Sequence, residues 1–184
     1  MNPLALTISF TLGCAAFGGA AHLQSPAPAA LPQDPPALAN PLIDYPGFLC
    51  DALAAQQDRA MRRLTEAQFA AMLGQPDTVL LDARSADKFA MRHIQGAISL
   101  PFTDFTAASL AGAIPTKATR VLIYCNNNFA GDPGAFAEKS APASLNISTY
   151  IALGTYGYTN VYELGPLLDV RTTSLPFAGT AIGR

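Results

Sequence analysis

Short apolar runs alternate along the chain with longer segments whose apolar positions recur at helical spacing. The runs at residues 78–82, 97–100, 120–124 and 160–163 are short and largely apolar. Strands of this kind, separated by helices, are typical of a parallel sheet that is covered on both faces. The pattern therefore predicts an α/β fold, a small doubly wound parallel sheet with helices on both faces.

Several of the intervening segments begin with a residue that favours the start of a helix. Thr65, Ser85 and Thr106 each precede such a segment, and Gln68 completes a capping box with Thr65. The predicted helices span residues 48–64, 65–73, 85–92, 106–114 and 146–156.

The chain before the first predicted helix differs in composition from the rest. Residues 4–17 are nearly all apolar or small, and small residues of the kind that a signal peptidase reads follow them. Residues 22–46 are rich in Pro and Ala and lack helical periodicity, which indicates an extended linker. We therefore expect a signal peptide at residues 1–21, a linker at 22–46 and a single domain at 47–184.

The predicted signal peptide indicates a periplasmic or secreted protein. Its apolar stretch is shorter than the roughly 20 residues of a spanning helix, so we expect no membrane span in the mature chain. A lipoprotein signal around Cys14 is the alternative, although Thr11 stands where such signals usually carry leucine. A formal net charge of -2 and a charged fraction of 13% predict no nucleic-acid partner.

A single cysteine follows one of the apolar runs. Cys125 comes directly after residues 120–124 and precedes three consecutive asparagines. If Cys14 leaves with the signal peptide, only Cys50 and Cys125 remain, too few for a disulfide framework. Either the two pair or at least one is a free thiol, and Cys125 is either a nucleophile or a buried cysteine at a strand end.

Three blocks of the sequence resemble the rhodanese-like family. They are Leu80 to Arg84 with Phe89 and His93 to Pro101, then Val121 to Cys125, and finally Tyr156 to Leu164. Their order and spacing resemble those of the family across residues 65–165. The resemblance implies the small doubly wound α/β fold of that family.

The resemblance also implies that Cys125 is the active-site cysteine of a sulfurtransferase. In rhodaneses the thiolate attacks the outer sulfur of a donor such as thiosulfate, holds it as a persulfide and passes it on. The implied partners are a small anionic sulfur donor and a thiol or other nucleophilic acceptor, and no cofactor is implied. Backbone N–H groups that surround the sulfur would stabilise the thiolate. The substrate-binding candidates are Asn126, Asn127, Asn128, Phe129, Ala130 and Arg84.

The chain departs from the family pattern after the cysteine. Residues 126–131 include no cation, although sulfurtransferases of this type often carry a basic residue there. An insertion at 132–144 delays the next helix to about Asn146, so that its amino terminus need not point at Cys125. Gly131 stands where phosphatases of this fold need an arginine, which excludes phosphatase chemistry.

Two cations near the predicted site have more than one interpretation. Arg84 lies at the carboxyl end of a strand, where it would bind an anionic donor or pair with Asp82, Asp87 or Asp104. Lys139, in the insertion, is either a replacement cation or a solvated loop lysine.

The alternative function is a rhodanese-fold module without the chemistry. Such a module would bind a partner, or would sense redox state through a Cys50–Cys125 disulfide, and the insertion and the missing cation favour it. We expect a structural role for His93, which belongs to the family signature. No spacing typical of metal ligands occurs, so no metal site is predicted.

Overall fold

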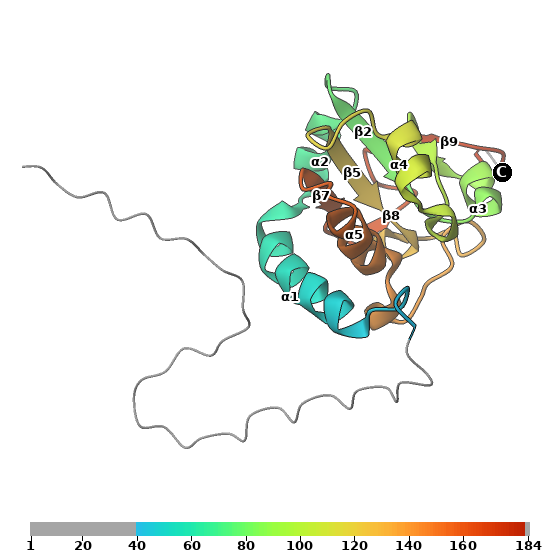
Figure 1. Ribbon diagram of the computed structural model, residues 1–184. Coiled ribbons are helices and arrows are strands. Elements are labelled where there is room, and N and C mark those ends of the chain that lie inside the picture. Colours follow the sequence, from blue (N-terminus) through green and yellow to red (C-terminus); the bar gives the residue numbers. More distant parts are fainter. Residues whose placement is uncertain (1–39, 183–184) are drawn as a thin grey trace, which may run out of the picture. The chain divides into compact units, whose positions relative to one another are not determined.

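A five-stranded parallel sheet forms the centre of the protein in a computed structural model that describes residues 40–182 (Figure 1). The strand order is β1 (Arg63–Leu64), β7 (Val161–Leu164), β5 (Arg120–Tyr124), β2 (Thr78–Asp82) and β4 (Ile98–Ser99). Every neighbouring pair in this order is parallel. The predicted doubly wound α/β fold is confirmed.

Helices cover both faces of this sheet. The core on one face includes side chains of α1 (Tyr45–Arg62), α4 (Ala107–Ala113) and α5 (Leu145–Thr155). The core on the other face includes side chains of α2 (Glu66–Met72) and α3 (Ala86–Met91). The described residues from Leu42 onwards belong to one compact unit.

Strand β5 links the two cores because its side chains alternate between the faces. Val121 and Ile123 pack into the core beneath α1, α4 and α5, whereas Leu122 and Tyr124 pack into the opposite one. A strand that is apolar on both faces belongs in the middle of a sheet, and β5 lies between β7 and β2. Cys125 is therefore delivered to the carboxyl edge of the sheet, where open α/β folds place their ligands.

The first helix begins earlier than the sequence predicts. Helix α1 starts at Tyr45, inside the predicted linker at residues 22–46. The side chain of Asp44 caps it by accepting a 2.8 Å hydrogen bond from the N–H of Gly47. Pro46 lies in the first turn, where its missing N–H is no loss, so a residue taken as part of the linker is part of the helix. The predicted signal peptide and residues 22–39 lie outside the described residues, and both stay predictions.

Two short strand pairs that the sequence pattern does not predict hold the loops at the edge of the sheet. Strand β3 (His93–Ile94) pairs antiparallel with β9 (Phe177–Ala178). Strand β6 (Phe129–Ala130) pairs parallel with β8 (Leu168–Asp169). After a short 3-10 turn that follows Cys125, the chain is thus paired with the segment after β7, and no α-helix follows directly. Among residues 40–182, three 3-10 turns complete the connections, η2 (Phe102–Asp104), η3 (Asn126–Asn128) and η4 (Ala141–Ala143).

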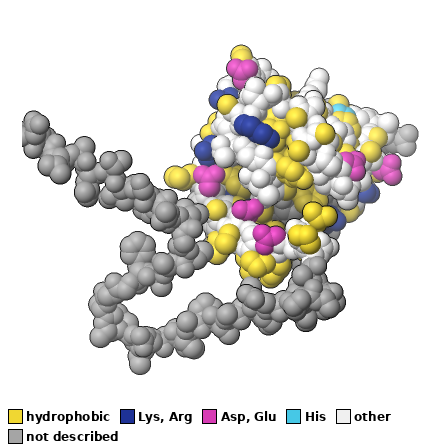
Figure 2. Space-filling view, in the orientation of Figure 1, with side chains coloured by type: hydrophobic (Ala, Val, Ile, Leu, Met, Phe, Trp, Pro, Cys, Tyr) yellow, Lys and Arg dark blue, Asp and Glu magenta, His cyan; other side chains and the backbone are white. Residues whose placement is uncertain are grey.

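Exposed apolar side chains surround the start of α1, and hydrophobic atoms are visible on this part of the surface (Figure 2). Ile43 is 74% exposed, Tyr45 59% and Phe48 49%. The opposite side of α1 packs on the sheet through Ala52 and Ala55. Among residues 40–182, no helix combines the length and apolar character needed to cross a membrane.

Candidate functional site

Cys125 lies at the carboxyl end of β5 with its thiol against the start of α5. The residue is 1% exposed, and its Sγ is 3.4 Å from the Oγ of Ser144. Ser144 is the N-cap residue of α5, and its side chain makes no capping hydrogen bond within the helix. The insertion therefore does not separate the helix from the cysteine, because the inserted chain returns and places the helix start at the sulfur. The sulfur therefore faces a helix amino terminus, which carries partial positive charge, and a hydroxyl group that can donate a hydrogen bond.

Asn128 fixes the backbone around the cysteine. Its Oδ1 accepts hydrogen bonds from the backbone N–H of Cys125 at 2.9 Å and from Nδ2 of Asn146 at 3.0 Å. Its Nδ2 donates to the carbonyl oxygens of Leu164 at 2.8 Å and Pro166 at 3.2 Å. This buried side chain thus joins β5, β7 and α5 at the position of the thiol.

The other loop candidates all line a neighbouring pocket that does not include Cys125. Asn127 exchanges two hydrogen bonds with the backbone of Lys139, at 2.7 and 3.2 Å, and so holds the inserted loop. Asn126 is buried and lines two neighbouring pockets. Phe129 is 3% exposed in an aromatic cluster with Phe136, whose ring centroid lies 4.7 Å away. The structure brings Asn127 and Asn128 to the pocket of Cys125, but not Asn126, Phe129 or Ala130.

A pocket of about 300 Å³ opens beside Cys125 and contains two arginines that the sequence pattern does not single out. Arg59 comes from the last turns of α1, and Arg63 from β1. The pocket is also lined by Asn127, Asn128, Ala141, Ser144, Asn146, Ile147, Glu163, Leu164 and Gly165. Two cations from a distant part of the chain therefore line the same pocket as Cys125.

Glu163 holds both arginines in place. Arg59 donates from Nη2 to both carboxylate oxygens of Glu163, at 2.7 and 2.9 Å. The Nε of Arg63 lies 3.1 Å from Oε1 of the same carboxylate, and its Nη2 donates to the carbonyl oxygen of Gly165 at 3.1 Å. The side chain of Glu163 is 1% exposed, so this carboxylate is a buried anchor for two cations.

Arg84, which the sequence offers as a residue that binds the sulfur donor, is buried and makes its hydrogen bonds inside the protein. Its Nη2 donates to Oδ2 of Asp82 at 2.6 Å and its Nε to Oδ1 of Asp82 at 2.9 Å. Nη1 donates to the carbonyl oxygen of Ala135 at 2.9 Å. Of the two interpretations offered by the sequence, the ion pair with Asp82 is the arrangement observed. Asp82 also accepts a hydrogen bond from the hydroxyl of Tyr124, and burial raises the pKa of this tyrosine well above its usual value.

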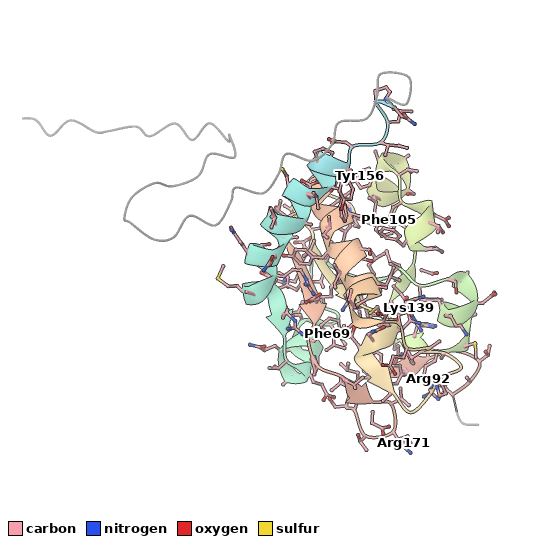
Figure 3. All side chains as sticks on the ribbon, turned by 90° about the horizontal axis from the view of Figure 1, so that it is seen from below. Phe69, Arg92, Phe105, Lys139, Tyr156 and Arg171 are labelled. Atoms are coloured by element: carbon pink, nitrogen blue, oxygen red, sulfur yellow. The ribbon has the colours of Figure 1, made fainter. Side chains whose placement is uncertain are left out.

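Lys139 lies beside a different pocket. With Arg84, Lys88 and Asn126, it lines a hollow of about 500 Å³ between the loop after β2 and the inserted loop. In Figure 3, Lys139 lies on the side of α5 away from α1, which carries Arg59. The structure therefore does not bring Lys139 to the thiol as a replacement cation.

His93 and Cys50 lie away from the site. The imidazole of His93 stacks on Phe89 with ring centroids 3.8 Å apart, and its Nδ1 is 2.8 Å from the carbonyl oxygen of Phe89. Cys125 is not in a disulfide, and Cys50 is exposed on α1. Arg59 follows Cys50 by nine positions along α1, a rise of about 13.5 Å. In the described part of the chain, no three His, Cys, Asp or Glu side chains gather as metal ligands.

One feature of the sequence indicates that a cation lies near Glu163. Glu163 lies in a strand between apolar residues, and a carboxylate in such a place needs a cationic partner. The partner could not be chosen from the pattern, because Arg59 is separated from Glu163 by 104 residues. Only the parallel pairing of β1 with β7 brings Arg63 next to Glu163.

This geometry defines an α/β protein with a cysteine at the carboxyl edge of a parallel sheet, and comparison with known proteins identifies its class. Residues 65–165, more than half of the chain, match the Rhodanese-like domain family. The chain belongs to this family. It is 30% identical over 90 residues to the thiosulfate sulfurtransferase PspE of Escherichia coli K12, a match that covers 49% of this chain and 71% of that protein.

Solved structures of similar proteins include the rhodanese-like domain of Alr3790 from Anabaena sp. and a rhodanese from E. coli with anions. The first is 20% identical to this chain and has a TM-score of 0.48. The match covers 67% of this chain and 83% of the Anabaena chain. The second is 24% identical to this chain and has a TM-score of 0.39. The match covers 56% of this chain and 99% of the E. coli chain. Arg59 and Arg63 lie before the segment that matches the family.

Proposed function

We propose that the protein is a sulfurtransferase that carries a sulfur atom on Cys125 as a persulfide. The observation that carries this proposal is the position of the Cys125 thiol, which lies against the N-cap of α5 in a pocket with two arginines. The 30% identity to a thiosulfate sulfurtransferase supports the same chemistry.

The reaction takes place in two displacement steps. The Cys125 thiolate attacks the outer sulfur of thiosulfate, the bond between the two sulfur atoms breaks, and sulfite leaves with the electron pair. A thiol or other nucleophilic acceptor then attacks the outer sulfur of the persulfide and restores the Cys125 thiolate. No oxidant or cofactor enters either step.

The surroundings of the thiol fit the demands of both steps. The hydroxyl of Ser144 and the start of α5 face the sulfur on which negative charge resides before the first step and after the second. Arg59 and Arg63 give the pocket the positive charge that attracts an anionic donor. The asparagine network around Asn128 keeps the backbone of Cys125 fixed, which orients the thiol without a movement of the loop.

Sulfite release tests the proposal. The purified protein, mixed with excess thiosulfate and no acceptor, is expected to release about one sulfite per Cys125, and then to turn over when a thiol is added. The Cys125→Ser variant is expected to release none, and Cys50→Ser to behave like the wild type. Release by Cys125→Ser at the wild-type level would overturn the proposal.

The burial of Cys125 favours a second candidate, a rhodanese-fold module that binds a partner without chemistry. A thiol that is 1% exposed is poorly placed for a large acceptor. For this candidate, no sulfur adduct forms on Cys125 with any of several donors. The redox version needs a Cys50–Cys125 bridge, and the position of Cys50 on α1 does not favour it.

A further inference from the structure

We propose that Arg59 and Arg63 form the subsite that holds the anionic end of the sulfur donor, an oxyanion such as the sulfonate group of thiosulfate. The subsite is built by α1 and β1, which lie before the family-matched segment 65–165. This inference rests on the proposed sulfur transfer for its biological role, but not for its test.

The charges of the pocket leave it positive. Arg59 and Arg63 share one carboxylate, that of Glu163, which neutralises only one of the two cations. Glu163 is the only acidic residue among the described residues that line the pocket. An anion that enters the pocket therefore meets a net positive charge. The buried carboxylate of Glu163 keeps the two arginines close together.

The arginines also have hydrogen-bond donors to spare. Their bonds to Glu163 and Gly165 engage Nε and Nη2, and in the described part of the chain Nη1 of neither arginine has a hydrogen-bond partner. The side chain of Arg63 is 55% exposed and that of Arg59 24%, so both are reached from solvent. Guanidinium groups with free N–H pairs are well suited to the oxygens of sulfonate and similar anions.

The position of the arginines agrees with the reaction geometry. Cys125 lines the same pocket, so a donor whose oxygens lie on the arginines keeps its outer sulfur inside the space that the thiol borders. The alternative cations, Lys88 and Lys139, line another pocket that does not include Cys125. Residues 126–131 carry no cation, so the arginines take the place of the basic residue that this loop lacks.

Thiosulfate binding to a protein that cannot react tests the inference. The Cys125→Ser variant retains the pocket and cannot form a persulfide, so its dissociation constant for thiosulfate is measured by calorimetry at low, fixed ionic strength. Adding Arg63→Gln is expected to weaken binding by roughly tenfold or more, because a charge-assisted hydrogen bond is lost. Adding Lys139→Gln, the matched control in the other pocket, is expected to leave binding unchanged.

The contribution of Arg59 needs a variant that avoids a buried, unpaired carboxylate. In the same Cys125→Ser background, Arg59→Gln combined with Glu163→Gln removes one positive and one negative charge together, so the net charge of the pocket is unchanged. Binding is still expected to weaken by roughly tenfold, because the guanidinium donors of Arg59 are lost and Arg63 loses its anchor. If that protein does not fold by circular dichroism, Arg59→Lys supplies the measurement, and its loss of the planar fork is expected to weaken binding severalfold.

The outcomes separate this inference from sulfur transfer. Binding that is unchanged in the arginine variants, or weakened as much by Lys139→Gln, overturns the arginine subsite. Lack of saturable thiosulfate binding by Cys125→Ser also overturns it. If the arginines bind thiosulfate but the wild-type protein releases no sulfite, the subsite stands and the sulfurtransferase proposal fails.

Discussion

At the scale of single residues, Asn128 does more to shape the site than its neighbours in the asparagine run. In the sequence, Asn126, Asn127 and Asn128 are equally good candidates for substrate binding. In the structure Asn128 makes four hydrogen bonds inside the protein, to Cys125 just after β5, to β7, to α5 and to the segment after β7. Three identical residues in a row give no pattern that could distinguish their roles, because the roles depend on chain segments about 10 to 40 residues away.

We predict that Asn128→Ala destabilises the fold and abolishes sulfur transfer. Each buried partner left without its hydrogen bond costs about 1–3 kcal/mol, and the carbonyl of Leu164 and the N–H of Cys125 are such partners. Urea denaturation measures the loss of unfolding free energy. Asn127→Ala, at a more exposed position, is the control and is expected to cost less than about 1 kcal/mol. Equal stability of the two variants would contradict the account.

Arg84 is predicted to be a residue of stability and not of donor binding. Arg84→Met leaves Asp82 buried without its cation, which costs about 3–5 kcal/mol of unfolding free energy. The double change Asp82→Asn with Arg84→Met is expected to cost much less than the sum of the single changes, because it leaves no unpaired charge. Chemical denaturation of the three variants checks this, and additive costs would sink the idea that the pair acts as a unit.

At the scale of elements, the regular part of the fold could be predicted from the sequence. Strands β2 and β5 have the predicted bounds because they are apolar on both faces. Helices α2 and α4 start after the predicted caps, Thr65 and Thr106, and each cap forms a capping box. The pairs β3–β9 and β6–β8 could not be predicted, since strands of two residues carry no periodicity and their partners are distant in sequence.

The start of α5 is expected to serve the reaction more than the fold. Ser144 makes no side-chain capping bond, so Ser144→Ala is predicted to change stability by less than about 0.5 kcal/mol. Its hydroxyl faces the Cys125 sulfur, so the same change is predicted to slow sulfite release by about tenfold. Thr65→Ala is the opposite case, with a loss of about 1 kcal/mol from the capping box of α2 and unchanged sulfite release. Similar behaviour of the two variants in both measurements would contradict this assignment.

The surroundings of Glu66, in the first turn of α2, lead us to expect that the free energy of unfolding falls at acid pH. The hydroxyl of Thr173 donates to its Oε1 at 2.6 Å, and the backbone and hydroxyl of Ser174 donate to the same oxygen. These bonds lower the pKa of Glu66 from its ordinary value of 4.5. A carboxylate with a lowered folded-state pKa stabilises the fold above its unfolded pKa, and the effect is lost as the pH falls through the folded-state value.

The corresponding variant is Glu66→Gln, whose side chain does not titrate. Between about pH 5 and pH 3, the urea midpoint of the wild type is expected to fall further than that of the variant, because only the wild type loses the charged form. Parallel pH profiles of the two proteins would show that the contact between α2 and the C-terminal segment contributes nothing to this dependence.

At the scale of the whole molecule, the site is assembled from segments on both sides of the family boundary. The matched segment, residues 65–165, supplies Cys125, the asparagine network and Glu163. Helix α1 and strand β1, which precede that segment, supply the two arginines. The position of the cysteine could be predicted from the sequence because strand, loop and edge follow from local pattern. The cations could not, because they reach the pocket only through the tertiary packing of α1 and the β1–β7 pairing.

The mass of the intact protein after incubation with thiosulfate tests directly whether Cys125 forms a persulfide. The wild type is expected to gain one sulfur atom, which a thiol acceptor removes and which peptide mapping places on Cys125. Cys50→Ser is predicted to gain the same atom, and Cys125→Ser to gain none. A sulfur atom on Cys50, or no adduct on Cys125 with thiosulfate and other sulfur donors, would contradict the account.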